Sequence, residues 1–266
     1  MNYYGMGYWV LGLAIGVSAA GALVGLACVR QSTLSITQRF RLVWLTAAAG
    51  SIGGVGTWLA VYVTLLGVGI SGGEVRYDVN RMVVAMAVAA VTTLVGLLMA
   101  GRNATPGRIV GGGAVMGLGI GVMHWLALAA IRVNGSVEVN ILMSLAAAGL
   151  AIAASIGLLW ASSRLRAMPA LAGIAVLYAL AVTAMHSLGL SGVQAHVDSG
   201  VGEPNGNDLF TLFVPVFVVG TLSLAIPITA VLVAPDRTGT TRSRESVRAE
   251  AGPDAEHPDS APQLVN

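Results

Sequence analysis

The chain has 266 residues, of which 56% are hydrophobic and only 10% are charged, and it contains 35 glycines. This composition is typical of a multi-pass membrane protein and excludes an ordinary soluble domain. The basic residues are 14 arginines spread over several loops and the net charge is +2, so nothing indicates nucleic-acid binding. The single cysteine, Cys28, excludes an internal disulfide and a cysteine-based metal site.

Seven apolar stretches follow one another along the chain, each long enough to cross a bilayer as a helix. The first is preceded by a segment without a positive residue, which argues against a cleaved signal peptide. Between the first two stretches, residues 30–41 are predicted to form a basic loop. The fold class is therefore all-α, a seven-transmembrane-helix bundle in the cell membrane. The predicted helices are residues 8–29, 42–66, 82–100, 109–131, 139–161, 170–192 and 212–234.

The arginines indicate how the bundle is oriented. Eleven lie in the C-terminal segment or in the loops that follow the first, third and fifth helices, whereas the opposite loops hold three. By the positive-inside rule, the N-terminus is expected outside and the C-terminus in the cytoplasm. Residues 1–235 are predicted to form the membrane domain. Residues 236–266, which are polar and rich in Pro, are predicted to be a disordered cytoplasmic tail with no room for an output domain.

The fourth helix carries a histidine on a glycine-lined face. Gly113, Gly117, Gly121, His124 and Leu128 fall on one narrow stripe when each residue advances by about 100°. Small residues every fourth position let another helix backbone come close, because helix association in lipid relies on van der Waals contact. The imidazole therefore points into the bundle, where an ionisable residue is a functional-site hypothesis by default.

An internal repeat of helix pairs places a second histidine at the same depth. Aligning the second, fourth and sixth helices matches Val61, His124 and His186, spaced 63 and 62 residues apart. His124 lies eight residues before Arg132, or roughly 12 Å along a helix, which places it in the outer leaflet. His186 should match this depth. We expect the two imidazoles to lie within about 5 to 8 Å of each other, close enough to share an ion.

The stretch MGLGIGVMHWLALAA, from Met116 to Ala130, resembles the MHYT family of bacterial seven-helix membrane domains, named for a Met-His-Tyr-Thr motif that recurs in three helices. The resemblance implies a sensory module that binds copper through His and Met and thereby senses oxygen, carbon monoxide or nitric oxide. Only Met123-His124 and Met185-His186 survive of the motif. The first histidine is Val61, Tyr is replaced by Trp125 and Ser187, and Leu65, Leu128 and Leu190 stand where a later Met is expected.

The candidate metal ligands are two imidazoles and four thioethers. Imidazole suits copper, zinc and iron, and thioethers suit Cu(I), so copper is the first cofactor expected and a haem with two axial histidines is the second. His196, in an outer loop, extends the candidate site toward solvent. The predicted ligands are His124, His186, Met123, Met185, Met86 and Met82.

Two further roles for the histidines stay open at this point. In a structural role, each imidazole hydrogen-bonds to a backbone carbonyl or to a hydroxyl on a neighbouring helix. In the other role, the histidines handle a proton or a small ligand. The available hydroxyls are those of Ser144, Thr92, Thr93, Thr183 and Thr57.

The sequence does not indicate an enzyme, because no carboxylate lies in a predicted span and no Ser-His-Asp order occurs. The first functional hypothesis is a sensory or ligand-binding membrane module that signals through a separate membrane or cytoplasmic protein. The alternative is a non-enzymatic membrane scaffold that has lost the metal site. A transporter is disfavoured, since no span contains the acidic or basic residue that usually marks an ion path. The oligomeric state is left open.

Overall fold

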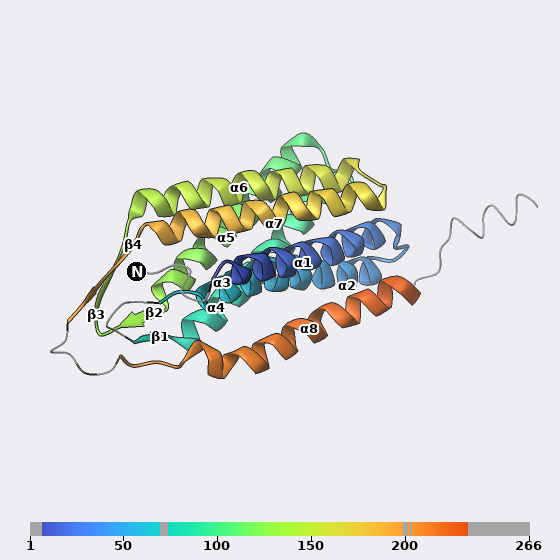
Figure 1. The fold of residues 1–266 in the computed structure, drawn as a ribbon. Helices are drawn as coiled ribbons and strands as arrows, with labels where there is room; N and C mark the ends of the chain where they lie inside the picture. The colour runs from blue at the N-terminus through green and yellow to red at the C-terminus, as the bar shows by residue number, and fades with distance from the viewer. Residues whose placement is uncertain (1–6, 70–73, 199–201, 203, 234–266) are drawn as a thin grey trace, which may run out of the picture. The chain divides into compact units, whose positions relative to one another are not determined.

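The computed structural model describes residues 7–69, 74–198, 202 and 204–233 (Figure 1). Seven helical segments within these residues are long and apolar enough to cross a membrane, which confirms the seven-helix prediction and a multi-pass membrane protein. The predicted tail lies outside the described residues. The helices are α1 (Trp9–Leu34), α2 (Gln38–Ala49), η1 (Gly50–Leu59), α3 (Ala60–Leu65), α4 (Val79–Ala100), α5 (Pro106–Ala129), α6 (Ile141–Arg164), α7 (Met168–Ser191) and α8 (Leu209–Val233).

Helix α1 and helix α2 reach further into the predicted basic loop than expected. The prediction of a loop over residues 30–41 was wrong, because α1 continues to Leu34 and α2 already begins at Gln38. Thr37 caps α2, since its hydroxyl oxygen accepts a hydrogen bond from the backbone N–H of Phe40 at 3.3 Å. Apolar length alone therefore underestimates these helices, because polar residues in their terminal turns remain helical.

Four short strands lie together at the opposite end of the bundle, where only loops were expected (Figure 1). The predicted helix over 109–131 stops at Ala129, and position 139, predicted to begin the next helix, is the last residue of a strand. Strand β1 (Val75–Tyr77) pairs antiparallel with β2 (Ile131–Val133), and β3 (Gly135–Val139) pairs antiparallel with β4 (Val193–Val197). We call the end of the bundle that carries the four strands the strand end. The other end, where α1, α4 and α6 finish, is called the arginine end.

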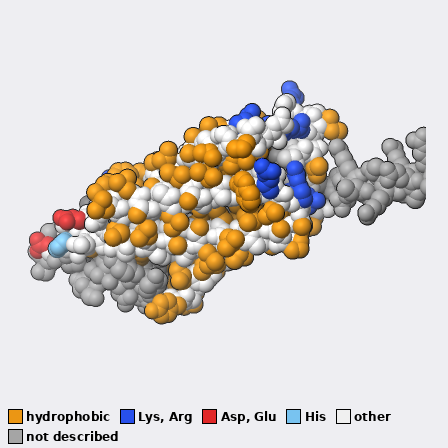
Figure 2. Space-filling view, turned by 90° about the horizontal axis from the view of Figure 1, so that it is seen from above, with side chains coloured by type: hydrophobic (Ala, Val, Ile, Leu, Met, Phe, Trp, Pro, Cys, Tyr) orange, Lys and Arg blue, Asp and Glu red, His pale blue; other side chains and the backbone are white. Residues whose placement is uncertain are grey.

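The surface separates apolar and charged side chains as a membrane protein requires. On the face shown in Figure 2, hydrophobic side chains cover the middle of the molecule, arginines gather toward one end, and acidic side chains lie at the other. A hydrophobic band between two charged ends matches a bilayer core between two headgroup layers.

The second membrane span changes its helical geometry halfway along. Its middle part, η1, is a π-helix of ten residues between the α-helical segments α2 and α3. The hydroxyl of Thr57 donates to the carbonyl of Ile52 at 2.8 Å, and it also hydrogen-bonds to the Tyr178 hydroxyl on α7 at 2.9 Å. Long π segments are rare and occur often at functional sites. Here the hydrogen bond between Thr57 and Tyr178 joins the π-helical segment directly to α7.

Glycines bring the helix backbones into contact. A Cβ placed on Gly21 of α1 would lie 2.6 Å from the Cα of Gly56 in η1. A Cβ on Gly112 of α5 would lie 2.5 Å from the carbonyl oxygen of Gly96 in α4, and one on Gly117 would lie 2.7 Å from the backbone nitrogen of Ile152 in α6. The predicted close approach along the α5 glycines is therefore confirmed, with α6 as the neighbour of Gly117.

We predict that Gly21→Ala destabilises the protein by about 1–3 kcal/mol, because the added methyl group overlaps backbone that cannot rotate away. Gly16→Ala on the same helix is the matched control, since a Cβ at Gly16 meets nothing within 4 Å. Thermal unfolding of both variants in detergent measures the difference. Equal melting temperatures for the two variants would contradict a backbone contact at Gly21.

Candidate functional site

Two buried histidines meet near the strand end. Nε2 of His124 and Nδ1 of His186 are 3.1 Å apart, a hydrogen-bond distance, and the ring planes are nearly perpendicular at 86°. The ring centroids are 5.2 Å apart, and each residue is only 2% exposed. The predicted meeting of the two imidazoles is confirmed. Each histidine lies five residues before the end of its helix, His124 in α5 and His186 in α7, so the predicted equal depth also holds.

A glycine that the sequence analysis did not single out makes room for the pair. Gly189 lies one turn after His186 on α7, and a Cβ placed on it would overlap Cε1 of His124 and lie 3.0 Å from its Nδ1. The His124 ring therefore rests directly on the α7 backbone. The spacing of three residues between His186 and Gly189 is the signal that could have identified this contact, because residues three apart share a helix face.

One nitrogen of the pair has no protein partner. Nε2 of His186 is buried and makes no hydrogen bond among the described residues. The same residue lines a small cavity of about 20 Å³, whose wall also includes Val10 and Leu11 of α1 and Thr64 of α3. A cavity of this size holds one water molecule and therefore has room for a diatomic ligand of similar size. An unpaired buried nitrogen beside such a cavity favours a bound non-protein partner.

None of the predicted hydroxyl partners hydrogen-bonds to an imidazole in the described part of the chain. Thr57 bonds to Ile52 and Tyr178, while Thr92, Thr183 and Ser144 donate to carbonyls of their own helices. Thr93 has a buried hydroxyl with no partner in the described part of the chain. In the structural alternative, each histidine would bond to such a group. The recorded partner of each ring is instead the other histidine.

The four candidate methionines lie in the hydrophobic core. Met82, Met123 and Met185 are buried, and Met86 is partly buried against the same core cluster, which also contains Leu128 and Leu190. Their role as metal ligands stays a prediction.

No group of three or more His, Cys, Asp or Glu that could hold a metal ion occurs in the described residues. His196, considered as an extension of the site, is exposed on β4 and pairs with Ser136 of β3.

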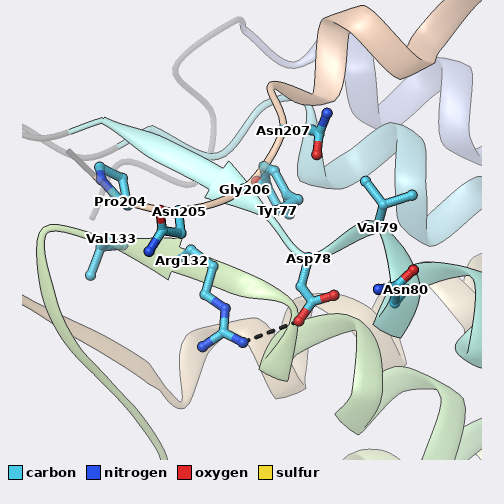
Figure 3. A pocket seen from close by; sticks show the side chains of 10 residues that line it. All are labelled: Tyr77, Asp78, Val79, Asn80, Arg132, Val133, Pro204, Asn205, Gly206 and Asn207. Carbon is cyan, nitrogen blue, oxygen red and sulfur yellow. Dashed lines mark hydrogen bonds and ion pairs between the residues drawn. The ribbon is translucent and has the colours of Figure 1, made fainter.

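A larger cavity of about 610 Å³ lies at the strand end (Figure 3). The residues that line it include Tyr77, Asp78, Arg132 and Asn205. Its two charged side chains are already paired, because Nη2 of Arg132 lies 3.1 Å from Oδ2 of Asp78. The Tyr77 hydroxyl donates to the carbonyl of Leu65 at 3.0 Å, and burial raises the pKa of Tyr77. These residues fasten β1 to the bundle and leave no uncompensated charge in the cavity wall.

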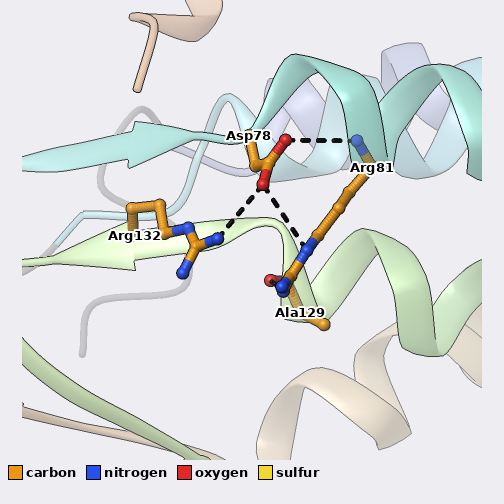
Figure 4. A network of polar contacts seen from close by, with 4 residues as sticks. All are labelled: Asp78, Arg81, Ala129 and Arg132. Carbon is orange, nitrogen blue, oxygen red and sulfur yellow. Dashed lines mark hydrogen bonds and ion pairs between the residues drawn. The ribbon is translucent and has the colours of Figure 1, made fainter. Parts of the chain in front are cut away.

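Asp78 is the centre of a polar clamp at the strand end (Figure 4). Its carboxylate accepts from the backbone N–H of Arg81 at 3.2 Å, which caps α4, and it pairs with Arg132 in the middle of β2. The Arg81 guanidinium in turn donates to the carbonyl of Ala129 at the end of α5. The hydrogen bonds from Arg81 and Arg132 lower the pKa of Asp78. The clamp thus ties α4 and β2 to the end of the helix that carries His124.

Comparison with known proteins identifies one match. Residues 117–176 match the MHYT family, described as a bacterial signalling protein N-terminal repeat. The matched segment contains His124, runs through β2, β3 and α6, and ends in the first half of α7, before His186. This confirms the resemblance noted at residues 116–130. The searches of curated proteins and of solved structures found no match.

We predict that Gly189→Ala breaks the histidine contact, because the methyl group would occupy the position of the His124 ring. Gly173→Ala on the same helix is the control, since a Cβ there meets nothing within 4 Å. Nitrogen NMR of ¹⁵N-histidine-labelled protein in detergent reports the ring hydrogen bond. Unchanged ring signals in Gly189→Ala would show that the two rings do not meet over this glycine.

We also predict an acid-dependent loss of stability through Asp78. Because the folded-state pKa of Asp78 is lowered, its contribution is complete above the unfolded value of about 3.9 and disappears as the pH falls through the folded value. Asp78→Asn keeps the helix cap but removes the charge, so it should lose about 1 kcal/mol at neutral pH and flatten the acid limb. Melting temperature against pH measures this, with exposed Glu138→Gln as the control. An identical pH profile in Asp78→Asn and the wild type would refute the clamp.

Proposed function

We propose that this MHYT-repeat protein is a membrane sensor module whose ligand binds at the histidine pair formed by His124 and His186. The observation that supports the proposal best is the meeting of two buried imidazoles at 3.1 Å, one of which keeps a buried nitrogen without a protein partner. A buried polar pair at a single depth in the bundle is costly unless its groups are used, so it favours a functional role. We propose no catalytic reaction for it.

The strand end is proposed to face the outside of the cell membrane. The described arginines in the helix ends and loops where α1 meets α2, α4 meets α5 and α6 meets α7 all lie toward the other end, as the positive-inside rule requires of a cytoplasmic face. In this orientation the N-terminus is outside and the histidine pair lies in the outer leaflet. A small ligand would then reach the pair from the extracellular side or from the lipid.

Copper is the cofactor that the donor set supports best. His124 and His186 would hold the ion, and a methionine thioether from the same core would complete a set that suits Cu(I). When bound, Cu(I) would supply a centre at which a diatomic gas coordinates. Haem fits less well, because a macrocycle between the rings would require the two nitrogens, now 3.1 Å apart, to separate much further than a single ion would. The two histidines would hold the ion, and the small adjoining cavity would limit the size of the ligand.

The proposed signal passes from α7 to the second membrane span. Tyr178 lies eight residues before His186 on α7, and its hydroxyl bonds to Thr57 in η1. A ligand that shifts α7 therefore acts on the π-helical segment. A separate membrane or cytoplasmic signalling protein is proposed to read this change.

A membrane scaffold is the second candidate, and the direct bond between the histidines favours it. Each ring already satisfies one nitrogen through the other, so the pair can serve as a crosslink between α5 and α7. In this case no ligand would be needed.

We predict that purified protein binds Cu(I), and that His124→Ala and His186→Ala each weaken binding at least about tenfold, because one of two imidazole ligands is lost. His196→Ala removes an exposed histidine of β4 and should leave the affinity unchanged. Titration with a competing chelator and elemental analysis measure binding, and melting temperatures verify folding. His186→Gln, which keeps a polar group at the site, serves if the alanine variants do not fold.

Equal copper affinity in the wild type and the paired-histidine variants would remove the metal proposal. If these variants bind no less copper but melt at lower temperature, the scaffold is the better description.

A further inference from the structure

The arginine end contains a cavity that the histidine pair does not involve. It has a volume of about 320 Å³, within the range of small-ligand sites. It lies where α1, α4 and α6 finish and where α2 starts. Part of its wall is apolar, including Val29, Leu45, Leu97 and Leu159.

Four arginines line this cavity. Arg41 comes from α2, Arg164 is the last residue of α6, and Arg102 and Arg166 lie in the two loops that follow α4 and α6. Arginines at this end are expected as orientation signals, but those would be scattered over the surface. Arg30 and Arg39 are of that kind, since neither lines the cavity. Of the four that line it, Arg102, Arg164 and Arg166 are exposed and Arg41 is partly buried. Figure 2 shows the arginines gathered toward this end.

The four positive charges have no acidic partner among the described residues. No aspartate or glutamate of the described residues lines the cavity, and the ion pairs of Asp78 and Glu74 are with Arg76, Arg81 and Arg132 at the strand end. Nε of Arg41 is buried and has no hydrogen-bond partner within the described part of the chain. An unpaired buried donor on a charged group is unfavourable, so this arrangement favours an anion in the cavity.

The hydroxyls in the cavity wall leave the guanidinium groups as its main donors. Ser32 and Thr33 donate to carbonyls of α1, while Ser162 and Ser163 donate to carbonyls of α6. Arg102 also donates to the carbonyl of Ser35. The other three guanidinium groups have no recorded acceptor in the described part of the chain, and each is a planar fork that pairs with two oxygens of a phosphate.

We propose that this cavity is a binding site for a phosphate group. The phosphate can come from the headgroup of an anionic phospholipid or from a soluble phosphorylated molecule, and the apolar part of the wall accommodates the remainder of either. The site is independent of the histidine pair, because it lies at the opposite end of the bundle.

Binding of inorganic phosphate to the full chain in a neutral detergent tests the proposal. The melting temperature should rise with phosphate in a saturable manner, and sodium chloride at equal ionic strength should not reproduce the rise. Arg41→Gln and Arg164→Gln should each weaken the apparent affinity about tenfold, since each removes a charge-assisted pair. Arg41→Lys, which keeps the charge but loses the fork, should weaken it less.

Arg39→Gln is the matched control, because Arg39 lies on the same helix as Arg41 but outside the cavity. Equal losses in Arg39→Gln and Arg41→Gln, or no saturable effect of phosphate on the wild type, would overturn the proposal.

Nanodiscs distinguish the two sources of phosphate. In discs of phosphatidylcholine, phosphate should bind as in detergent. If adding phosphatidylglycerol abolishes phosphate binding, and Arg41→Gln weakens retention of that lipid, the occupant is a headgroup. If phosphate still binds in the presence of phosphatidylglycerol, the occupant is soluble. Both results support a phosphate site.

Discussion

Contact between glycine backbones is the constraint on which this bundle depends. Lipid offers no hydrophobic force between helices, so their association requires close packing. Gly21 against Gly56 and Gly96 against Gly112 supply it by removing side chains from the interface. The histidine pair uses the same device, because His124 reaches His186 across the bare backbone of Gly189. The site is therefore a product of the packing and could not be kept if α5 and α7 moved apart.

The seven spans and the depth of the histidines could be predicted, because both follow from properties that add along the chain. Apolar length sets the spans, and a constant rise per residue sets the depth. The strands could not be predicted in this way. Residues 135–139 form strand β3 only because they pair with β4, and the whole of α6 and α7 separates the two strands in the sequence. Likewise, the start of α2 depended on the cap at Thr37, and the end of α1 on a last turn of mostly polar residues.

The sequence also could not show which neighbouring helix each residue of α5 contacts. The stripe of Gly113, Gly117 and His124 is narrow, yet its members meet two different helices. The glycines contact Ile156 and Ile152 of α6, whereas His124 contacts α7. The direct bond between the histidines and the convergence of four arginines on one cavity are tertiary features of the same kind. Residue spacing gives the rotation about one axis but not the position of the next helix.

The π-helical segment is hydrogen-bonded to α7, the helix that carries His186. Tyr178 precedes His186 by about 12 Å along α7 and by about 80° of rotation, so both lie on a similar face of that helix. The Tyr178 hydroxyl holds Thr57, which also occupies the carbonyl of Ile52. In the proposed sensor, a displacement of α7 would therefore act on the part of the second span whose hydrogen bonding departs from the α-helix. Because η1 lies between α2 and α3, a change in its turns would rotate one half of that span against the other.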